Sequence, residues 1–185
     1  MRVILSIIFL FLLLTSFCNS YLLNDDKLNA FRTLSVNEGL SHTDATGIIQ
    51  DNSGFIWIST LAGLDRFDGY EVKNYKFKNF GIKNVYLNRI NDIDYNNQKI
   101  WIASQEGIGY FDCLGYEFHV PKFDVDVSKI SFGQIKSIDE SRFTAISRGK
   151  LYFFKKEANV YKVAKFENNL PFVSCIDVIG GKTIV

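Results

Sequence analysis

Two tryptophans and two aspartates are the side chains in this sequence whose surroundings first suggest chemistry. Trp57 and Trp101 each stand inside an Ile-Trp-Ile run and could stack against sugar rings. Packing between sheets explains both better, because each has apolar neighbours along its strand. Asp51 and Asp68 could act as carboxylate catalysts or Ca²⁺ ligands, but both begin turn sequences in which Asp bonds to the backbone. We therefore predict structural roles for all four residues.

The remaining reactive side chains form no catalytic or metal-binding pattern. His42 lies in a polar loop far from His119, and no spacing supports a Ser-His-Asp or Cys-His arrangement. Cys113 and Cys175 have no Cys-x-x-Cys partner. A disulfide between them is possible after export, but free buried thiols fit better because they lie in different repeats. We expect no catalytic residue, metal or cofactor, and the ligand-binding residues stay unassigned.

Short strands hold these residues. Residues 55–60 are aromatic and β-branched, and they follow the turn sequence Asp-Asn-Ser-Gly. Residues 64–67 form a second apolar run that closes on Asp-Gly, a strong hairpin signal. Residues 72–77 alternate apolar and polar, and residues 46–50 can supply a further strand. Four short antiparallel strands in about 35 residues are the size of one propeller blade.

The pattern recurs further along the chain. Four anchors repeat at an offset of 44 residues: Trp57 and Trp101, Gly63 and Gly107, Phe67 and Phe111, Asp68 and Asp112. A fainter third copy lies 42 residues beyond the second, at Phe143, Gly149 and Phe153. Repeats of about 40–50 residues indicate propellers or solenoids, and strand-only content favours a propeller.

We therefore predict an all-β fold, an incomplete β-propeller of about three and a half four-stranded blades behind a signal peptide. The expected parts are a signal peptide at 1–20, an entry strand and loop at 21–45, blade 1 at 46–77, blade 2 at 88–123, a degenerate blade 3 at 134–166 and the start of a truncated blade 4 at 172–185. Closed propellers usually need four to eight blades. The chain is thus expected to be the N-terminal fragment of a longer protein.

The N-terminus has the layout of a secretory signal peptide. Arg2 precedes an apolar run at 3–14, and small polar residues lead to a possible cleavage point after Ser20. The run is too short to span a bilayer comfortably, although an uncleaved anchor is the alternative. Without the leader, 21 − 1 = 20 basic residues balance 20 acidic ones. No basic footprint for nucleic acid remains.

The blade motif resembles one known family. Residues 31–34 and 38–42, then 49–60 and 63–70, are similar to the opening repeat of the two-component regulator propeller family. That repeat is matched almost throughout, with Ser59 where Gly is usual. The second copy keeps the tryptophan core but has lost the Gln-Asp turn, and the third is degenerate.

The resemblance implies an exported sensor. Such regions are typically the N-terminal periplasmic parts of regulators anchored in the inner membrane, often hybrid histidine kinases, and many sense oligosaccharides. It implies that this segment binds a small-molecule ligand without chemistry, packs against the remaining propeller blades of a longer chain, and belongs to a homodimer at full length.

Two other classes stay open. Residues 50–57 resemble the Asp-box turn of sialidase-like propeller hydrolases, but Asn52 stands where that motif has Asp and Gln50 where it has Ser or Thr. The other alternative is a stand-alone propeller scaffold for protein interactions. The sequence that follows residue 185 would separate all three classes.

Overall fold

The structure is a computed structural model that describes residues 33–77, 85–165 and 172–185. The predicted signal peptide and the expected strand at Phe31 lie outside this range, and Leu34 is not in a strand. Apart from strands, the described residues contain two 3₁₀ turns, Val36–Glu38 and Val85–Asn88. None of the helical segments in these ranges is long and apolar enough to cross a membrane.

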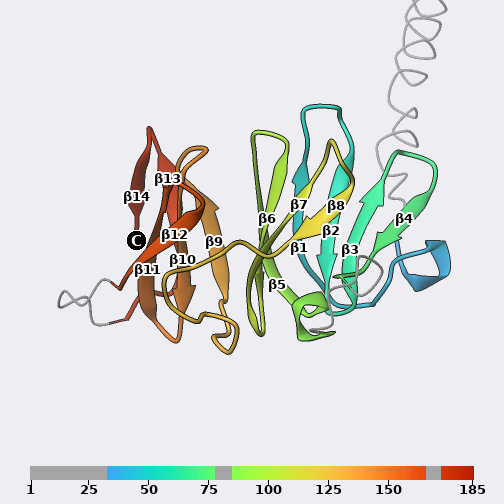
Figure 1. The fold of residues 1–185 in the computed structure, drawn as a ribbon. Coiled ribbons are helices and arrows are strands. Elements are labelled where there is room, and N and C mark those ends of the chain that lie inside the picture. The colour runs from blue at the N-terminus through green and yellow to red at the C-terminus, as the bar shows by residue number, and fades with distance from the viewer. Residues whose placement is uncertain (1–32, 78–84, 166–171) are drawn as a thin grey trace, which may run out of the picture. The chain divides into compact units, whose positions relative to one another are not determined.

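Twelve strands form three antiparallel sheets of four, and a separate hairpin follows (Figure 1). The first sheet has the order β1 (Ala45–Gln50), β2 (Ile56–Thr60), β3 (Gly63–Phe67) and β4 (Val72–Tyr75). The second consists of β5 (Ile90–Asn96), β6 (Lys99–Ser104), β7 (Gly107–Asp112) and β8 (Glu117–His119). The third consists of β9 (Gln134–Ser137), β10 (Arg142–Ser147), β11 (Lys150–Glu157) and β12 (Val160–Lys165), and the hairpin pairs β13 (Asp177–Ile179) with β14 (Lys182–Ile184). The predicted all-β, incomplete propeller is confirmed.

The first strand of each sheet lies beside the first strand of the next. β1 packs along β5, β5 packs along β9, and β13 approaches β9. Each sheet therefore presents its first strand to a common inner side, and later strands lie progressively outward. This is the arrangement of propeller blades around an axis.

Each tryptophan is buried between two adjacent blades. Trp57 is 1% exposed and its ring lies 5.1 Å from that of Phe111 in the second blade. Trp101 is 3% exposed and lies 4.3 Å from Phe143 in the third. The structural role predicted for both is confirmed, and neither indole ring lies open on the surface for a sugar to stack on.

The third copy is offset by one residue from the expected register. The β2–β3, β6–β7 and β10–β11 hairpins close on the pairs Thr60 with Gly63, Ser104 with Gly107, and Ser147 with Lys150. The second offset is thus 43 rather than the predicted 42. A slip of one residue moves a side chain to the other face of the sheet. The counterpart of Phe111 is therefore Phe154, which is 1% exposed, and not Phe153.

Side chains of one inner strand bond to the backbone of the next. Thr46 and Asn91 occupy equivalent irregular positions in β1 and β5, where the strand register shifts. The Thr46 hydroxyl donates to the Ile90 carbonyl at 2.9 Å, and the Asn91 amide donates to the Phe132 carbonyl at 2.7 Å. These bonds tie neighbouring blades together at the start of each inner strand.

Side chains on the innermost strand of a blade also accept hydrogen bonds from backbone N–H groups of the following blade. Asp92 accepts from the Ile135 N–H at 3.0 Å, and Gln134, its counterpart one blade on, accepts from the Ile176 N–H at 3.0 Å. Burial raises the pKa of the Asp92 carboxyl. Asp94 adds a bond from the Ser137 N–H at 2.8 Å. Side chains of the preceding blade therefore hydrogen-bond the free edges of β5 and β9 and the residue before β13.

The two described cysteines are free thiols in different surroundings. Cys113 is half-buried, whereas Cys175 is exposed, so the expectation of two buried thiols is wrong for Cys175. It lies on the segment that leads into the two-stranded hairpin, where no complete blade covers it. Burial, helped by the nearby carboxylates of Asp51 and Asp112, raises the pKa of Cys113 to about 12.

Replacing Trp57 by alanine should destabilise the protein by about 3–5 kcal/mol, because large aromatic truncations in a core leave a cavity. Chemical denaturation of the wild type and the variant measures the difference. Tyr70→Ala is the matched control, since that side chain is 87% exposed and its loss should change stability by less than about 0.5 kcal/mol. Equal effects of the two changes would contradict the inter-blade core.

The two thiols should react at different rates. At pH 8 Cys175 is expected to react with a maleimide reagent much faster than Cys113, because the thiolate is the nucleophile and the Cys113 thiol stays protonated. Residue-resolved mass spectrometry follows both labels in one sample. In denaturant the rates should converge. Similar rates in the folded protein would show that the Cys113 thiol is not shielded.

Candidate functional site

The two ends of the blades differ in chemistry. Because the strands are antiparallel, the β1–β2 and β3–β4 turns share one end, and the β2–β3 turn and the connections between blades share the other. At the first end, four aspartates bond to backbone N–H groups of their own turns: Asp51, Asp68, Asp112 and Asp139. We refer to this as the aspartate end.

These carboxylates are committed to structure. Asp51 accepts from the N–H groups of Ser53 and Phe55 at 2.9 and 3.0 Å, and from the Trp57 indole at 2.7 Å. The Arg142 guanidinium beside Asp139 lowers the pKa of that carboxyl to about 2. The predicted turn roles of Asp51 and Asp68 are confirmed. The described residues contain no group of three or more His, Cys, Asp or Glu side chains that could hold a metal ion.

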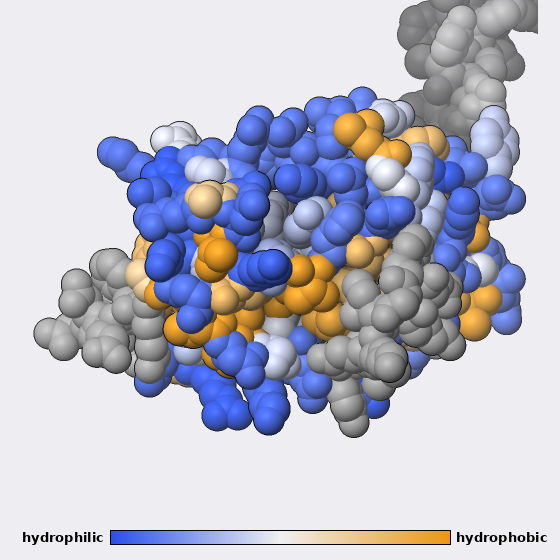
Figure 2. Space-filling view, viewed as in Figure 1, coloured by the Kyte–Doolittle hydropathy of each residue, from blue (hydrophilic) through white to orange (hydrophobic). Residues whose placement is uncertain are grey.

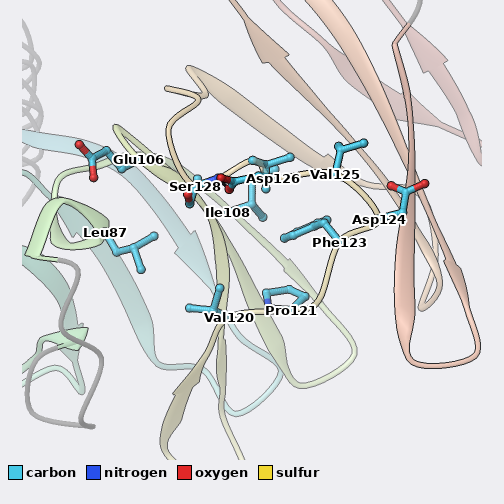
Figure 3. Close-up of a pocket in the computed structure, with 12 residues that line it drawn as sticks. Leu87, Glu106, Ile108, Val120, Pro121, Phe123, Asp124, Val125, Asp126 and Ser128 are labelled. Carbon is cyan, nitrogen blue, oxygen red and sulfur yellow. Dashed lines mark hydrogen bonds between the residues drawn. The ribbon is translucent and has the colours of Figure 1, made fainter.

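The opposite end, which we call the connection end, carries a pocket of about 440 Å³ (Figure 3). Its walls come from the β6–β7 turn at Glu106, the connection between β8 and β9 at 120–128, and Leu87 before β5. Known small-molecule pockets span about 300–1,000 Å³. The pocket is therefore large enough for a small ligand.

The pocket has an apolar lining and acidic margins. Ile108, Val120 and Phe123 supply apolar surface, while Glu106 and Asp124 carry carboxylates at opposite sides of the labelled group in Figure 3. On the surface in this region, apolar side chains gather over the connection between β8 and β9 (Figure 2). The arrangement can pack an apolar ring face and accept hydrogen bonds from ligand hydroxyls.

Hydrogen bonds hold the connection in place. The Asp124 side chain accepts from the Val163 N–H at 3.0 Å, and the Gly107 N–H donates to the Ile130 carbonyl at 2.8 Å. The Ser128 hydroxyl and N–H beside Asp126 lower the pKa of that carboxyl. The wall is bonded to both the second and the third blade, so the pocket is formed before any ligand arrives.

Gly107, an anchor of the repeat, lines this pocket, but none of the side chains considered for chemistry does. His42 accepts from the Asp44 N–H at 3.0 Å, and the His119 ring stacks on Tyr110. Sequence reasoning missed the pocket because most of its wall lies at the end of the second copy and in the link to the third, where no anchor of the repeat falls. The signal that could have indicated it is the alternation of polar and apolar residues from Lys122 to Val127, at the end of the predicted second blade and beyond it.

Comparisons with known proteins identify the fold. The sequence matches no protein-family model and no curated protein. Solved structures do match. The extracellular domain of the hybrid two-component system BT3049 from B. thetaiotaomicron is 20% identical, with a TM-score of 0.61 over 75% of this chain and 20% of that one. The extracellular domain of BT4673 from the same organism is 18% identical, with a TM-score of 0.60 over 80% of this chain and 23% of that one.

A third similar structure has a different role. PorZ, a surface component of the type-IX secretion system of Porphyromonas gingivalis, is 17% identical, with a TM-score of 0.53 over 75% of this chain and 19% of that one. The chain spans about one fifth of the length of each of these proteins. The resemblance indicated by the blade motif is confirmed in three dimensions: this chain has the fold found in extracellular domains that are described as parts of hybrid two-component systems.

Proposed function

We propose that this chain is the N-terminal part of an exported, ligand-sensing propeller of a membrane-bound two-component regulator. The observation that carries the proposal is the fold, which is shared with the extracellular domains of BT3049 and BT4673. The proposed function is ligand binding without a chemical reaction. Two observations support it: the aspartates accept hydrogen bonds within their own turns, and the pocket offers apolar surface and hydrogen-bond acceptors to a ligand. A signalling kinase would belong to another part of the protein.

The pocket at the connection end is the proposed ligand site, and an oligosaccharide is the proposed ligand. Sugars present apolar ring faces and many hydroxyl donors, which match the apolar lining and the carboxylates of Glu106 and Asp124. A ligand held between the β6–β7 turn and the 120–128 connection contacts both the second blade and the segment bonded to the third. Binding there favours one relative position of these two blades.

The cellular setting follows from the same proposal. The sensor faces the periplasm, packs against further propeller blades, is anchored in the inner membrane at full length and acts as a homodimer. One observation supports a second candidate, an interaction scaffold: PorZ, a surface component of a secretion system, shares the fold. A scaffold would bind a protein partner and not a small molecule.

The complete extracellular portion of the protein should bind an oligosaccharide without converting it. Isothermal titration against a panel of oligosaccharides tests binding, and chromatography of the same mixtures tests turnover. Glu106→Gln should weaken binding about 5–10-fold, or about 1–1.4 kcal/mol, through loss of a charged acceptor. Glu71→Gln is the matched control, because that side chain is exposed near the β3–β4 turn at the aspartate end.

Three outcomes count against the proposal. Release of shorter sugars would move the assignment to a hydrolase. If Glu106→Gln leaves the oligosaccharide affinity unchanged, the ligand binds outside this pocket. A panel without any binder, together with capture of a defined protein partner, would support the scaffold.

A further inference from the structure

The charged side chains that line the pocket at the connection end all have the same sign. Glu106, Asp124 and Asp126 line it, and among the described residues no lysine, arginine or histidine does. The lysines that flank this wall in the sequence, Lys122 and Lys129, are exposed and take no part in the lining. The lining itself therefore carries three acidic groups and no basic one.

These carboxylates are not neutralised by ion pairs. None of the three forms one within the described residues. Asp124 accepts from the Val163 N–H and Asp126 from the Ser128 N–H, and such bonds leave the charge in place. Because the Ser128 hydroxyl and N–H lower the pKa of Asp126, that carboxyl stays ionised at neutral pH.

The acidity belongs to this pocket and not to the chain as a whole. Outside the predicted signal peptide, basic and acidic residues are equal in number. A second cavity, of about 580 Å³ beside β11 and β12, has four basic residues and one acidic residue in its lining. Of the two cavities, the pocket at the connection end is thus the one whose charge attracts a cation.

The carboxylates stand around an apolar middle. Glu106 on the β6–β7 turn and Asp124 on the connection between β8 and β9 lie at opposite sides of the labelled group (Figure 3). Ile108 and Phe123 lie between them (Figure 3). The Phe123 ring packs against Phe154 of the third blade at 5.6 Å, which holds it in place. An aromatic ring attracts a cation placed over its face, so the middle of the pocket also tolerates a positive charge.

Glu106 is the carboxylate that is best placed to bind such a charge. Its side chain accepts no hydrogen bond from the described residues, whereas Asp124 already accepts one from Val163. A carboxylate without a partner at the margin of an apolar pocket can form a charge-assisted hydrogen bond with a ligand ammonium group. Such a bond is about twice as strong as one between neutral groups.

We propose that the oligosaccharide recognised by this pocket contains an amino sugar, whose ammonium group binds Glu106 while the sugar ring lies on the apolar lining. This inference rests on the proposed function and narrows it from oligosaccharides in general to those with a free amine. A neutral sugar offers hydroxyl donors alone. An acidic sugar is rejected, because its carboxylate meets groups of like charge.

Two disaccharides that differ in charge but share a backbone test the proposal. The β-1,4-linked glucosamine disaccharide carries ammonium groups, and its N-acetylated form carries neutral acetamides instead. Isothermal titration of the full-length protein should give an affinity about tenfold higher for the amine form. Sodium chloride should weaken binding of the amine form and leave the acetylated form nearly unaffected, because salt screens exposed charge pairs.

Variants connect this preference to the pocket. Glu106→Gln should remove most of the preference for the amine form, because the amide keeps an acceptor oxygen and loses the charge. Glu106→Lys reverses the sign and should weaken the amine form far more than the acetylated form. Glu71→Gln, an exposed change at the aspartate end, is the matched control and should leave both affinities unchanged.

Several outcomes would overturn the proposal. Equal affinities for the two disaccharides, or tighter binding of a neutral or acidic oligosaccharide, would refute the amino sugar and leave the sensor function standing. A diamine such as putrescine that binds as tightly as the glucosamine disaccharide would show that the pocket recognises amines without the sugar. If no oligosaccharide binds at all, the proposed function itself is wrong, and this inference is wrong with it.

Discussion

The fold depends on one constraint: adjacent blades are apolar on the faces that they share, so each such face must be covered by the neighbouring blade. Trp57 and Phe111 meet between the first and second blades, and Trp101 and Phe143 meet between the second and third. Burying these rings removes apolar surface from water, which is the main favourable term in folding. The stability of any one blade is therefore inseparable from that of its neighbours, as in other repeat proteins.

Hydrogen bonds at the inner edge meet a second requirement of this packing. An inner strand has one edge that no strand of its own sheet pairs, and unpaired backbone groups are costly when water is excluded. Asp92 and Gln134 accept from N–H groups of the following blade, at the same place in successive copies. Gly47 holds this position in the first blade, where an added Cβ would lie 3.3 Å from the Ile93 side chain of the second blade. A side chain is thus used where the blades leave room and omitted where they approach closely.

The two ends of the propeller have separate tasks. At the aspartate end, carboxylates close turns and, in the first blade, also hold a tryptophan in place. The connection end has longer segments whose residues are freer to differ between blades, and there the larger pocket lies. Binding residues on loops carried by a rigid scaffold are a general feature of proteins.

The sequence by itself determined the strands, the repeat and the buried roles of Trp57 and Trp101, because alternation, turn residues and spacing are local properties. Its faint third copy was placed one residue out of register, since Phe153 and Phe154 are both aromatic and only strand pairing decides which faces the core. The pocket at the connection end required tertiary structure, because Leu87, Glu106 and Phe123 belong to no common motif and meet only after the blades pack. The bond from the Trp57 indole to Asp51 likewise depends on the three-dimensional position of one carboxylate, which no pattern of residue types specifies.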